Sequence, residues 1–320
     1  MTITSAVSES VLARLAALLE AKRLAHAYLF VGPKSIGKKE TALAAARLVN
    51  CAQATQGHPC DACESCRKII RGMHPDIHLV ADGEGSIKIE DIREMLTQGQ
   101  LRAFEARFKV FIIVDAERLT LEAGNALLKT LEEPVKDTLI ILTTAMADHL
   151  LATVRSRCQV INFFGLTKDR LKKYFAADES LSDAQSQFLA YFAEGCPGRI
   201  APEDRREIFR RRNEAVDQFI FAQNEDRYLK SVLADPVRAA EMVRFLFCWF
   251  KDLWMLKADL PPGRIINADR LEDLNRQKAL HTFEDLEAIL FDIVRVKIAL
   301  DENFNVKIPL VLLKEKIWKR

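Results

Sequence analysis

The stretch that decides the fold is AYLFVGPKSIGKKETALAAARLVN, residues 27–50. Its apolar run at 27–31 predicts a short buried strand, and the alanine-rich run from Lys38 predicts a helix. The turn between them matches seven of the eight positions of the phosphate-binding loop G-x-x-x-x-G-K-[ST]. Strand, glycine-rich turn and helix in this order are the context that such a loop requires. We therefore predict a P-loop in which Gly32, Gly37 and Lys38 cradle phosphate.

The eighth position of the motif is Lys39 instead of Ser or Thr. A hydroxyl at this position normally binds magnesium, whereas an ammonium group can only donate hydrogen bonds. A glycine turn with no ligand is the alternative interpretation of the whole stretch. The substitution argues against catalysis, although it leaves the phosphate cradle intact.

The surrounding sequence predicts an α/β domain followed by helices. Further apolar runs at residues 76–80, 109–114, 137–144 and 158–163 predict strands, with helical spacing between most of them. Strands that alternate with helices indicate a doubly wound parallel sheet covered on both faces. From about residue 166 only helical periodicity remains, so we expect a small helical unit and then a longer one. A chain of 320 residues is long enough for two or three such domains.

Composition narrows the class of protein. The chain is 49% apolar and 29% charged, which is typical of a folded, soluble protein. A net charge of +2 provides no basic footprint for nucleic acid. No apolar run approaches the length of a membrane span, and the first residues do not resemble a signal peptide. We expect a cytoplasmic protein with no membrane partner.

Four of the seven cysteines fall within sixteen residues. Their spacing, Cys51-x8-Cys60-x2-Cys63-x2-Cys66, predicts a closed structural site with four thiolate ligands, which is typical of zinc. An iron–sulfur cluster or free thiols are the alternatives. His58 and His74 lie nearby but are not needed as ligands.

The predicted strand at 109–114 is followed by Asp115 and Glu117. P-loop proteins carry an acid at the end of a later buried strand, where it helps to hold magnesium. Asp115 is therefore a candidate for the nucleotide site. The alternative is a polar strand end without a ligand.

Several motifs resemble one family when they are taken in order. NALLKTLEEP (125–134) and RSRC (155–158) resemble the AAA+ subunits of the bacterial DNA polymerase III clamp loader, and in particular their delta-prime branch. The similarity also covers the P-loop, the four-cysteine insertion, HPD (74–76), IKIEDIRE (87–94) and GCPGR (195–199). It extends from about residue 26 to residue 199 and is weaker in the helical remainder.

The resemblance implies three domains and a set of partners. These would be an AAA+ domain at 1–165 with the zinc module at about 51–66, a helical lid at 166–203, and a helical collar at 204–320 that mediates oligomerisation. Members of this family form a hetero-pentamer of gamma/tau, delta and delta-prime subunits, which loads the sliding clamp onto primed DNA during replication. A member is thus a component of the DNA polymerase III holoenzyme.

The resemblance also implies roles for individual residues. Arg157, within the family's SRC motif, would act in trans on ATP bound by the adjacent subunit. The chain's own site for ATP or ADP would be degenerate and would include these residues: Gly32, Gly37, Lys38, Lys39, Asp115, Thr144 at the sensor-1 position and Arg199 at the sensor-2 position.

Counting back from NALLKTLEEP places Val114 where the family's motor subunits have the metal-binding Asp, and Asp115 where they have the catalytic Glu. Lys39 and Val114 would together remove both protein ligands of magnesium. We therefore expect ATPase activity of this chain alone to be weak or absent.

Two other functions remain open from the sequence. An active gamma/tau-type motor subunit would require intact magnesium ligands. A zinc-dependent nucleic-acid-binding module would require a basic surface with aromatic side chains around the cysteines. Residues 51–76 contain no Phe, Tyr or Trp.

Overall fold

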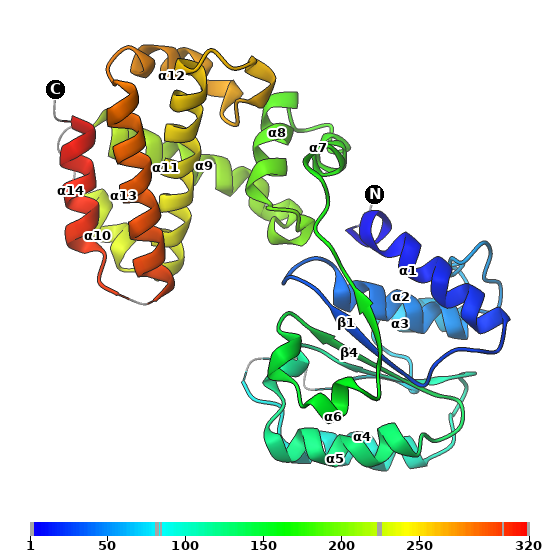
Figure 1. Ribbon diagram of the computed structural model, residues 1–320. Coiled ribbons are helices and arrows are strands. Elements are labelled where there is room, and N and C mark those ends of the chain that lie inside the picture. Colours follow the sequence, from blue (N-terminus) through cyan, green and yellow to red (C-terminus); the bar gives the residue numbers. More distant parts are fainter. Residues whose placement is uncertain (1–2, 81–82, 84, 223–225, 303, 319–320) are drawn as a thin grey trace. The chain divides into compact units, whose positions relative to one another are not determined.

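The computed structural model describes residues 3–80, 83, 85–222, 226–302 and 304–318. The chain forms two compact units, each described by itself: unit 1 contains residues 1–174 and 193–199, and unit 2 contains residues 175–192 and 200–320. Among the described residues every strand belongs to unit 1, and unit 2 is helical (Figure 1). The predicted change from an α/β pattern to helices is confirmed.

Unit 1 is built on a five-stranded parallel sheet with the strand order β2-β3-β4-β1-β5. The strands are β1 (Ala27–Val31), β2 (Ile77–Val80), β3 (Lys109–Ile113), β4 (Thr138–Thr144) and β5 (Gln159–Asn162). They match the apolar runs from which we predicted them. Since β1 pairs with both β4 and β5, the P-loop leaves the sheet from an inner strand.

Helices cover both faces of this sheet, as the doubly wound pattern predicts (Figure 1). The helices that begin in unit 1 are α1 (Ile3–Glu20), α2 (Lys38–Asn50), α3 (Glu64–Ile70), α4 (Ile89–Gln100), α5 (Leu121–Glu132), α6 (Ala152–Arg155) and α7 (Lys168–Ala176). Alternate residues of a strand enter opposite cores because side chains alternate across a sheet. Thus Phe30 packs with α1 and α2, whereas Leu29 packs with α4 and α5.

Local sequence explains where the helices beside the site begin and end. Helix α2 starts after Gly37, whose φ of 102° lies in the left-handed region that favours glycine. Helix α5 starts at an N-cap, Thr120, whose hydroxyl accepts a hydrogen bond from the N–H of Ala123. It ends at Glu132, two residues before Pro134, which a helix interior does not tolerate.

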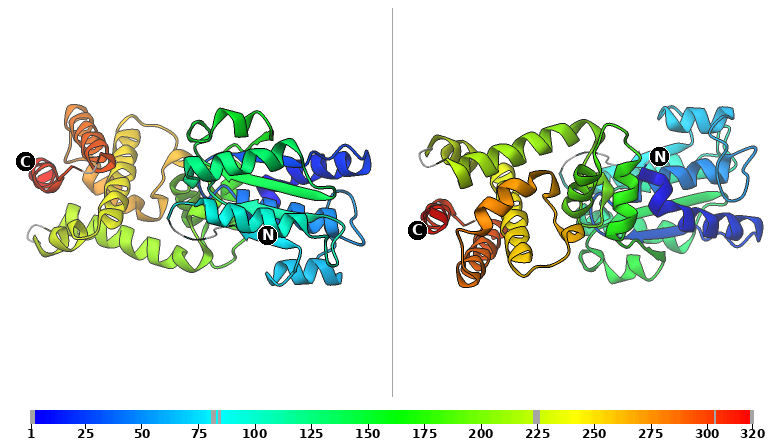
Figure 2. Two further views of the ribbon diagram at one scale, coloured as in Figure 1. Left: turned by 90° about the horizontal axis from the view of Figure 1, so that it is seen from below. Right: turned by 90° about the horizontal axis from the view of Figure 1, so that it is seen from above.

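Unit 2 is an assembly of helices around an aromatic core. Its helices are α8 (Asp183–Phe192), α9 (Arg205–Ala215), a π-helix (Val216–Phe221), α10 (Asp226–Leu233), α11 (Pro236–Lys257), α12 (Leu271–Lys278), α13 (Phe283–Asp301) and α14 (Lys307–Trp318). The long helices α11 and α13 pack side by side, as Figures 1 and 2 show. Trp249 and Phe245 of α11 are buried in this core.

The segment expected as a lid, 166–203, contributes to both units. Residues 175–192 belong to unit 2, whereas residues 193–199 return to unit 1. The division into an AAA+ domain, a lid and a collar therefore stays a prediction. None of the helices in the described part of the chain is both long and apolar enough to span a bilayer.

Candidate functional site

The P-loop of unit 1 is folded onto itself. The ammonium group of Lys38 donates to the backbone carbonyls of Gly32 and Pro33 at 2.8 and 2.9 Å. Burial lowers the pKa of Lys38, while the nearby carboxylates of Asp115 and Glu117 favour its charged form. The amine that the motif places at phosphate therefore has its hydrogen bonds supplied by the loop.

Residues 193–199, which include the GCPGR motif, pack against this loop within unit 1. The N–H of Gly198 donates to the carbonyl of Ser35 at 3.1 Å. A Cβ atom on Gly198 would lie only 2.7 Å from that oxygen, so only glycine permits this approach. Arg199, expected at the sensor-2 position, forms an ion pair with Glu194.

The ends of β3 and β4 lie beside the loop. Asp115 has a left-handed backbone (φ 51°), and its N–H donates to the hydroxyl of Thr143. Thr144, expected at the sensor-1 position, is buried; its hydroxyl accepts from the N–H of Met146, and its carbonyl accepts from the N–H of Gly32. Strand β4 is thereby hydrogen-bonded both to the P-loop, through Thr144, and to Asp115 at the end of β3, through Thr143.

The two substituted positions carry no ligand for a divalent metal. Lys39 is half-buried at the start of α2. Val114 packs with the apolar core between the sheet and helices α1 and α2. An ammonium group and an isopropyl group cannot coordinate magnesium.

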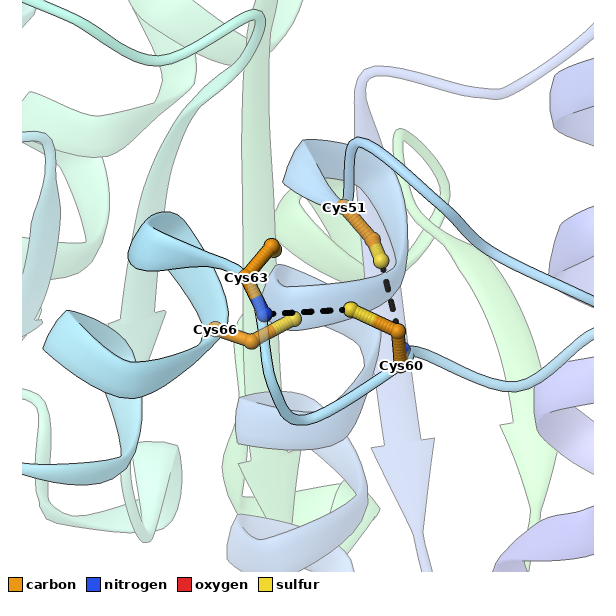
Figure 3. A group of neighbouring side chains, drawn as sticks. All are labelled: Cys51, Cys60, Cys63 and Cys66. Carbon is orange, nitrogen blue, oxygen red and sulfur yellow. Dashed lines mark hydrogen bonds between the residues drawn. The ribbon is translucent and has the colours of Figure 1, made fainter.

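A second site lies between α2 and α3, where the four predicted cysteines converge (Figure 3). Their sulfur atoms all lie within 4.8 Å of one another. Backbone N–H groups turn inward: the sulfur of Cys51 accepts from the N–H of Cys60 at 3.2 Å, and the sulfur of Cys60 accepts from the N–H of Cys63 at 3.3 Å. The predicted clustering is confirmed.

The donor set fits one thiophilic ion. Four sulfurs bound tetrahedrally at about 2.3 Å are separated by about 3.8 Å, which agrees with this cluster. An iron–sulfur cluster places several metal atoms between its cysteines and needs a wider spacing. Burial alone would raise the pKa of Cys63, but N–H groups of Cys66 and Ala52 and neighbouring thiols lower it to about 6. A thiolate is thus available for a metal at neutral pH.

A third group lies at the surface. Arg157 follows α6, and its side chain is 34% exposed. One of its nitrogens donates to the carbonyl of Thr153 at 3.0 Å, and another pairs with Glu132 at the end of α5. The guanidinium is therefore oriented by its own chain and still retains N–H groups that could reach outward.

Sequence reasoning missed three of these contacts. The sequence placed Glu117 only near the end of a strand, yet one Glu117 oxygen accepts a hydrogen bond from the N–H of Ala145, and the other is buried without a hydrogen-bond partner in the described chain. It did not foresee that Gly198 contacts Ser35 or that Glu132 holds Arg157. The motifs GCPGR and LEEP contained these residues, but no local pattern indicates contacts across such sequence distances.

Comparison with known proteins supports one family. Residues 7–167 match the family model described as DNA polymerase III, delta subunit. The chain is 41% identical to the DNA polymerase III subunit delta′ of Bacillus subtilis over 145 residues, or 45% of this chain and 44% of that one. It is 34% identical to the DNA polymerase III subunit tau of Escherichia coli over 192 residues, or 58% of this chain and 30% of that one. The matches thus span less than half the length of these relatives.

Among solved structures, a DNA polymerase III gamma subunit-related protein from Thermotoga maritima aligns with 96% of this chain and 99% of its own. Its sequence identity is 20% and its TM-score is 0.43. The family model covers half of the chain and includes the P-loop, the cysteine cluster and Arg157. The chain therefore belongs to the DNA polymerase III clamp-loader family that includes the delta′ and tau/gamma subunits.

Proposed function

We propose that this chain is a delta-prime subunit, a stationary AAA+ component of a clamp loader that places the sliding clamp on primed DNA. It would work in the cytoplasm within a hetero-pentamer of gamma/tau and delta subunits. Its contribution to catalysis would be Arg157, presented to ATP in the neighbouring subunit. The observation that carries the proposal is the partly exposed position of Arg157, before the amino end of β5, in a chain whose P-loop supplies its own lysine with hydrogen bonds.

The electrostatic role of Arg157 follows from the chemistry of phosphoryl transfer. Negative charge is spread over the γ-phosphate oxygens in the transition state. A guanidinium placed beside these oxygens stabilises that charge at a preorganised site. Because Thr153 and Glu132 already orient Arg157, less side-chain freedom would be lost when a neighbour's nucleotide is engaged.

The chain's own site supports little hydrolysis. Lys39 and Val114 offer no magnesium ligands, and residues 193–199 pack on the P-loop. Nucleotide could still bind through backbone N–H groups if Lys38 exchanged its two carbonyl partners for phosphate oxygens. Magnesium-assisted turnover would lack the charge compensation that the metal provides.

Unit 2 offers a surface suited to the proposed collar. Helix α13 exposes Phe291, Val294 and Ile298 at helical spacing, and α14 exposes Ile308 and Leu312. The opposite side of α14 is also apolar, with Leu310, Leu313 and Ile317 buried. A helix that is apolar on both sides is typical of an element buried between two partners. We therefore assign this face to contact with neighbouring subunits.

The cysteine cluster would hold zinc. One ion bound by Cys51, Cys60, Cys63 and Cys66 would have no open coordination position, so its role would be structural. It would join the end of α2 to the start of α3. Removal of zinc should unfold this module and lower the free energy of unfolding by an amount on the order of 4 kcal/mol.

Metal analysis tests this assignment. Elemental analysis of the purified chain should yield one zinc per chain, and a chelator should lower the melting temperature. Cys66→Ser should lose the metal, whereas Cys248→Ser, in the core of unit 2, should retain it. Retention of full zinc occupancy by the Cys66 variant would contradict the assignment.

ATP turnover tests the proposed function directly. The isolated chain should hydrolyse ATP no faster than a buffer control, whereas the complex assembled with gamma/tau and delta subunits should hydrolyse it rapidly. Rapid magnesium-dependent turnover by the isolated chain would instead identify it as a gamma/tau-type motor. The assembled complex lacking this chain should lose the turnover that depends on Arg157.

A further inference from the structure

Unit 1 contains a loop, residues 101–107, whose backbone N–H groups are hydrogen-bonded to a buried carboxylate. The carboxylate of Asp76, which is buried, accepts hydrogen bonds from the N–H groups of Phe104, Glu105 and Ala106 at 2.8–2.9 Å. Three backbone donors to one carboxylate hold the loop in a single conformation.

The buried ammonium group of Lys109 is hydrogen-bonded to the backbone at the start of the same loop. The ammonium group of Lys109 donates to the carbonyls of Gln98 and Leu101 at 2.9 Å and to that of Arg102 at 3.4 Å. Burying charged groups is unfavourable unless their hydrogen bonds are satisfied, and here both Asp76 and Lys109 are used to shape seven residues of loop.

The loop exposes two large apolar side chains, Leu101 and Phe104. Phe104 is 84% exposed, the highest value among the large apolar side chains of the described chain. The loop lies against α3, because Lys68 pairs with Glu105 at 2.7 Å. We define the α3 patch as residues 64–73 together with 101–107. Its other exposed apolar side chains are Ile70, Met73 and Leu101.

The α3 patch is also basic. It contains five cationic side chains and two carboxylates: Arg67, Lys68, Arg71, Arg102 and Arg107 against Glu64 and Glu105. Both carboxylates pair with the same residue, Lys68. The four arginines are exposed, so the excess positive charge on this small surface is larger than the net charge of +2 of the whole chain.

We propose that the α3 patch binds single-stranded nucleic acid. An exposed aromatic ring can stack on any base, and arginines beside it can contact the phosphates on either side. Charge favours this ligand over an apolar protein surface, because exposed arginines without an ion pair in the described part of the chain would be costly to bury against a neutral partner. The residues of the zinc module alone have no aromatic side chain; the fold supplies one from residue 104.

This site is distinct from the proposed nucleotide and arginine sites. Loop 101–107 precedes β3 and so lies at the amino ends of the parallel strands, whereas the P-loop follows the carboxyl end of β1. Arg157 precedes β5, which lies three strands away from β3 in the sheet order. The proposal therefore stands or fails independently of Arg157 and of the chain's ATPase activity.

Fluorescence anisotropy tests the proposal with the full chain and a labelled oligothymidylate of about 15 nucleotides. The chain should bind at roughly 50 mM salt and lose affinity as salt increases. Phe104→Ala should weaken binding about tenfold, since base–aromatic stacking makes a contribution of that size. Replacing Arg102 and Arg107 by Ala should reduce the salt slope by about 1.4, for two lost phosphate contacts.

Phe164→Ala is the matched control, because Phe164 is 78% exposed but follows β5 at the other edge of the sheet. This variant should bind as the unchanged chain does. Melting temperatures should be unchanged in both Phe variants, which separates a binding defect from misfolding. In Phe104→Trp, the added indole emission should be quenched by the oligonucleotide if the ring stacks on a base.

Three results would overturn the proposal. The first is no binding at low salt. The second is binding that is unaffected by Phe104→Ala and by the double arginine change. The third is a Phe104 variant that binds the oligonucleotide normally but assembles poorly with partner subunits, which would identify the α3 patch as a protein-docking surface.

Discussion

The cationic side chains of Lys38 in the P-loop and of Arg157 after α6 differ in what they are free to contact. Lys38 is buried and donates to two carbonyls of its own loop, whereas Arg157 is partly exposed and held by Thr153 and Glu132 at the surface. Both lie in unit 1, near the same sheet. The difference indicates that a phosphate-binding motif in the sequence does not by itself establish a working site, because the hydrogen-bond partners of its lysine decide what it can reach.

The largest expected effect belongs to Arg157. Arg157→Ala in the assembled complex should slow single-turnover hydrolysis at the adjacent subunit by about 10³-fold, the range in which arginine fingers act. Rapid-quench measurement of phosphate formation checks this. The melting temperature of the isolated variant should stay within a degree or so, since the side chain is at the surface. Unchanged hydrolysis would show that Arg157 does not act on the nucleotide of the adjacent subunit.

The second effect concerns the packing on the P-loop. Gly198→Ala places a Cβ atom 2.7 Å from the carbonyl oxygen of Ser35. We expect a loss of about 1–3 kcal/mol in the free energy of unfolding, measured by denaturant titration. Gly263→Ala is the matched control, because its Cβ would have no atom within 4 Å. Equal stability of the two variants would show that residues 193–199 do not press on the loop.

A smaller effect is expected from the carboxylate that orients Arg157. Glu132→Gln should lower hydrolysis by the assembled complex about threefold, because the assembly must then order the guanidinium itself. The affinity for nucleotide should not change. Glu133→Gln, at the adjacent exposed position, should have no effect. Faster hydrolysis by the Glu132 variant would mean that the carboxylate competes with phosphate for Arg157.

The smallest effect should come from the P-loop lysine. Lys38→Met should change turnover by the assembled complex less than about twofold, although loss of two hydrogen bonds should destabilise the chain by about 1–2 kcal/mol. Steady-state turnover and thermal unfolding measure the two quantities. A severe loss of turnover without loss of stability would show that this chain's own nucleotide site is active, and the contrast with Arg157 would then fail.

Much of the architecture was predictable because it depends on local patterns. The apolar runs around 27–31 and 137–144 became the adjacent strands β1 and β4. The four cysteines were also predictable as a cluster, since close spacing along the chain limits how far apart they can lie. The contacts of Lys38, Gly198 and Glu132 were not, because each depends on backbone groups or side chains brought together by folding.

The sequence by itself determined the P-loop turn, the alternation that builds a parallel sheet, the metal-binding spacing and the loss of a magnesium ligand at Lys39. These are consequences of residue type and short-range spacing. Only the tertiary structure decided that Lys38 donates to its own loop, that Glu132 orients Arg157, and that Glu105, next to Phe104, pairs with Lys68 of α3. The physical reason is that hydrogen bonds and charge depend on distance in space, which packing sets between residues remote in the chain.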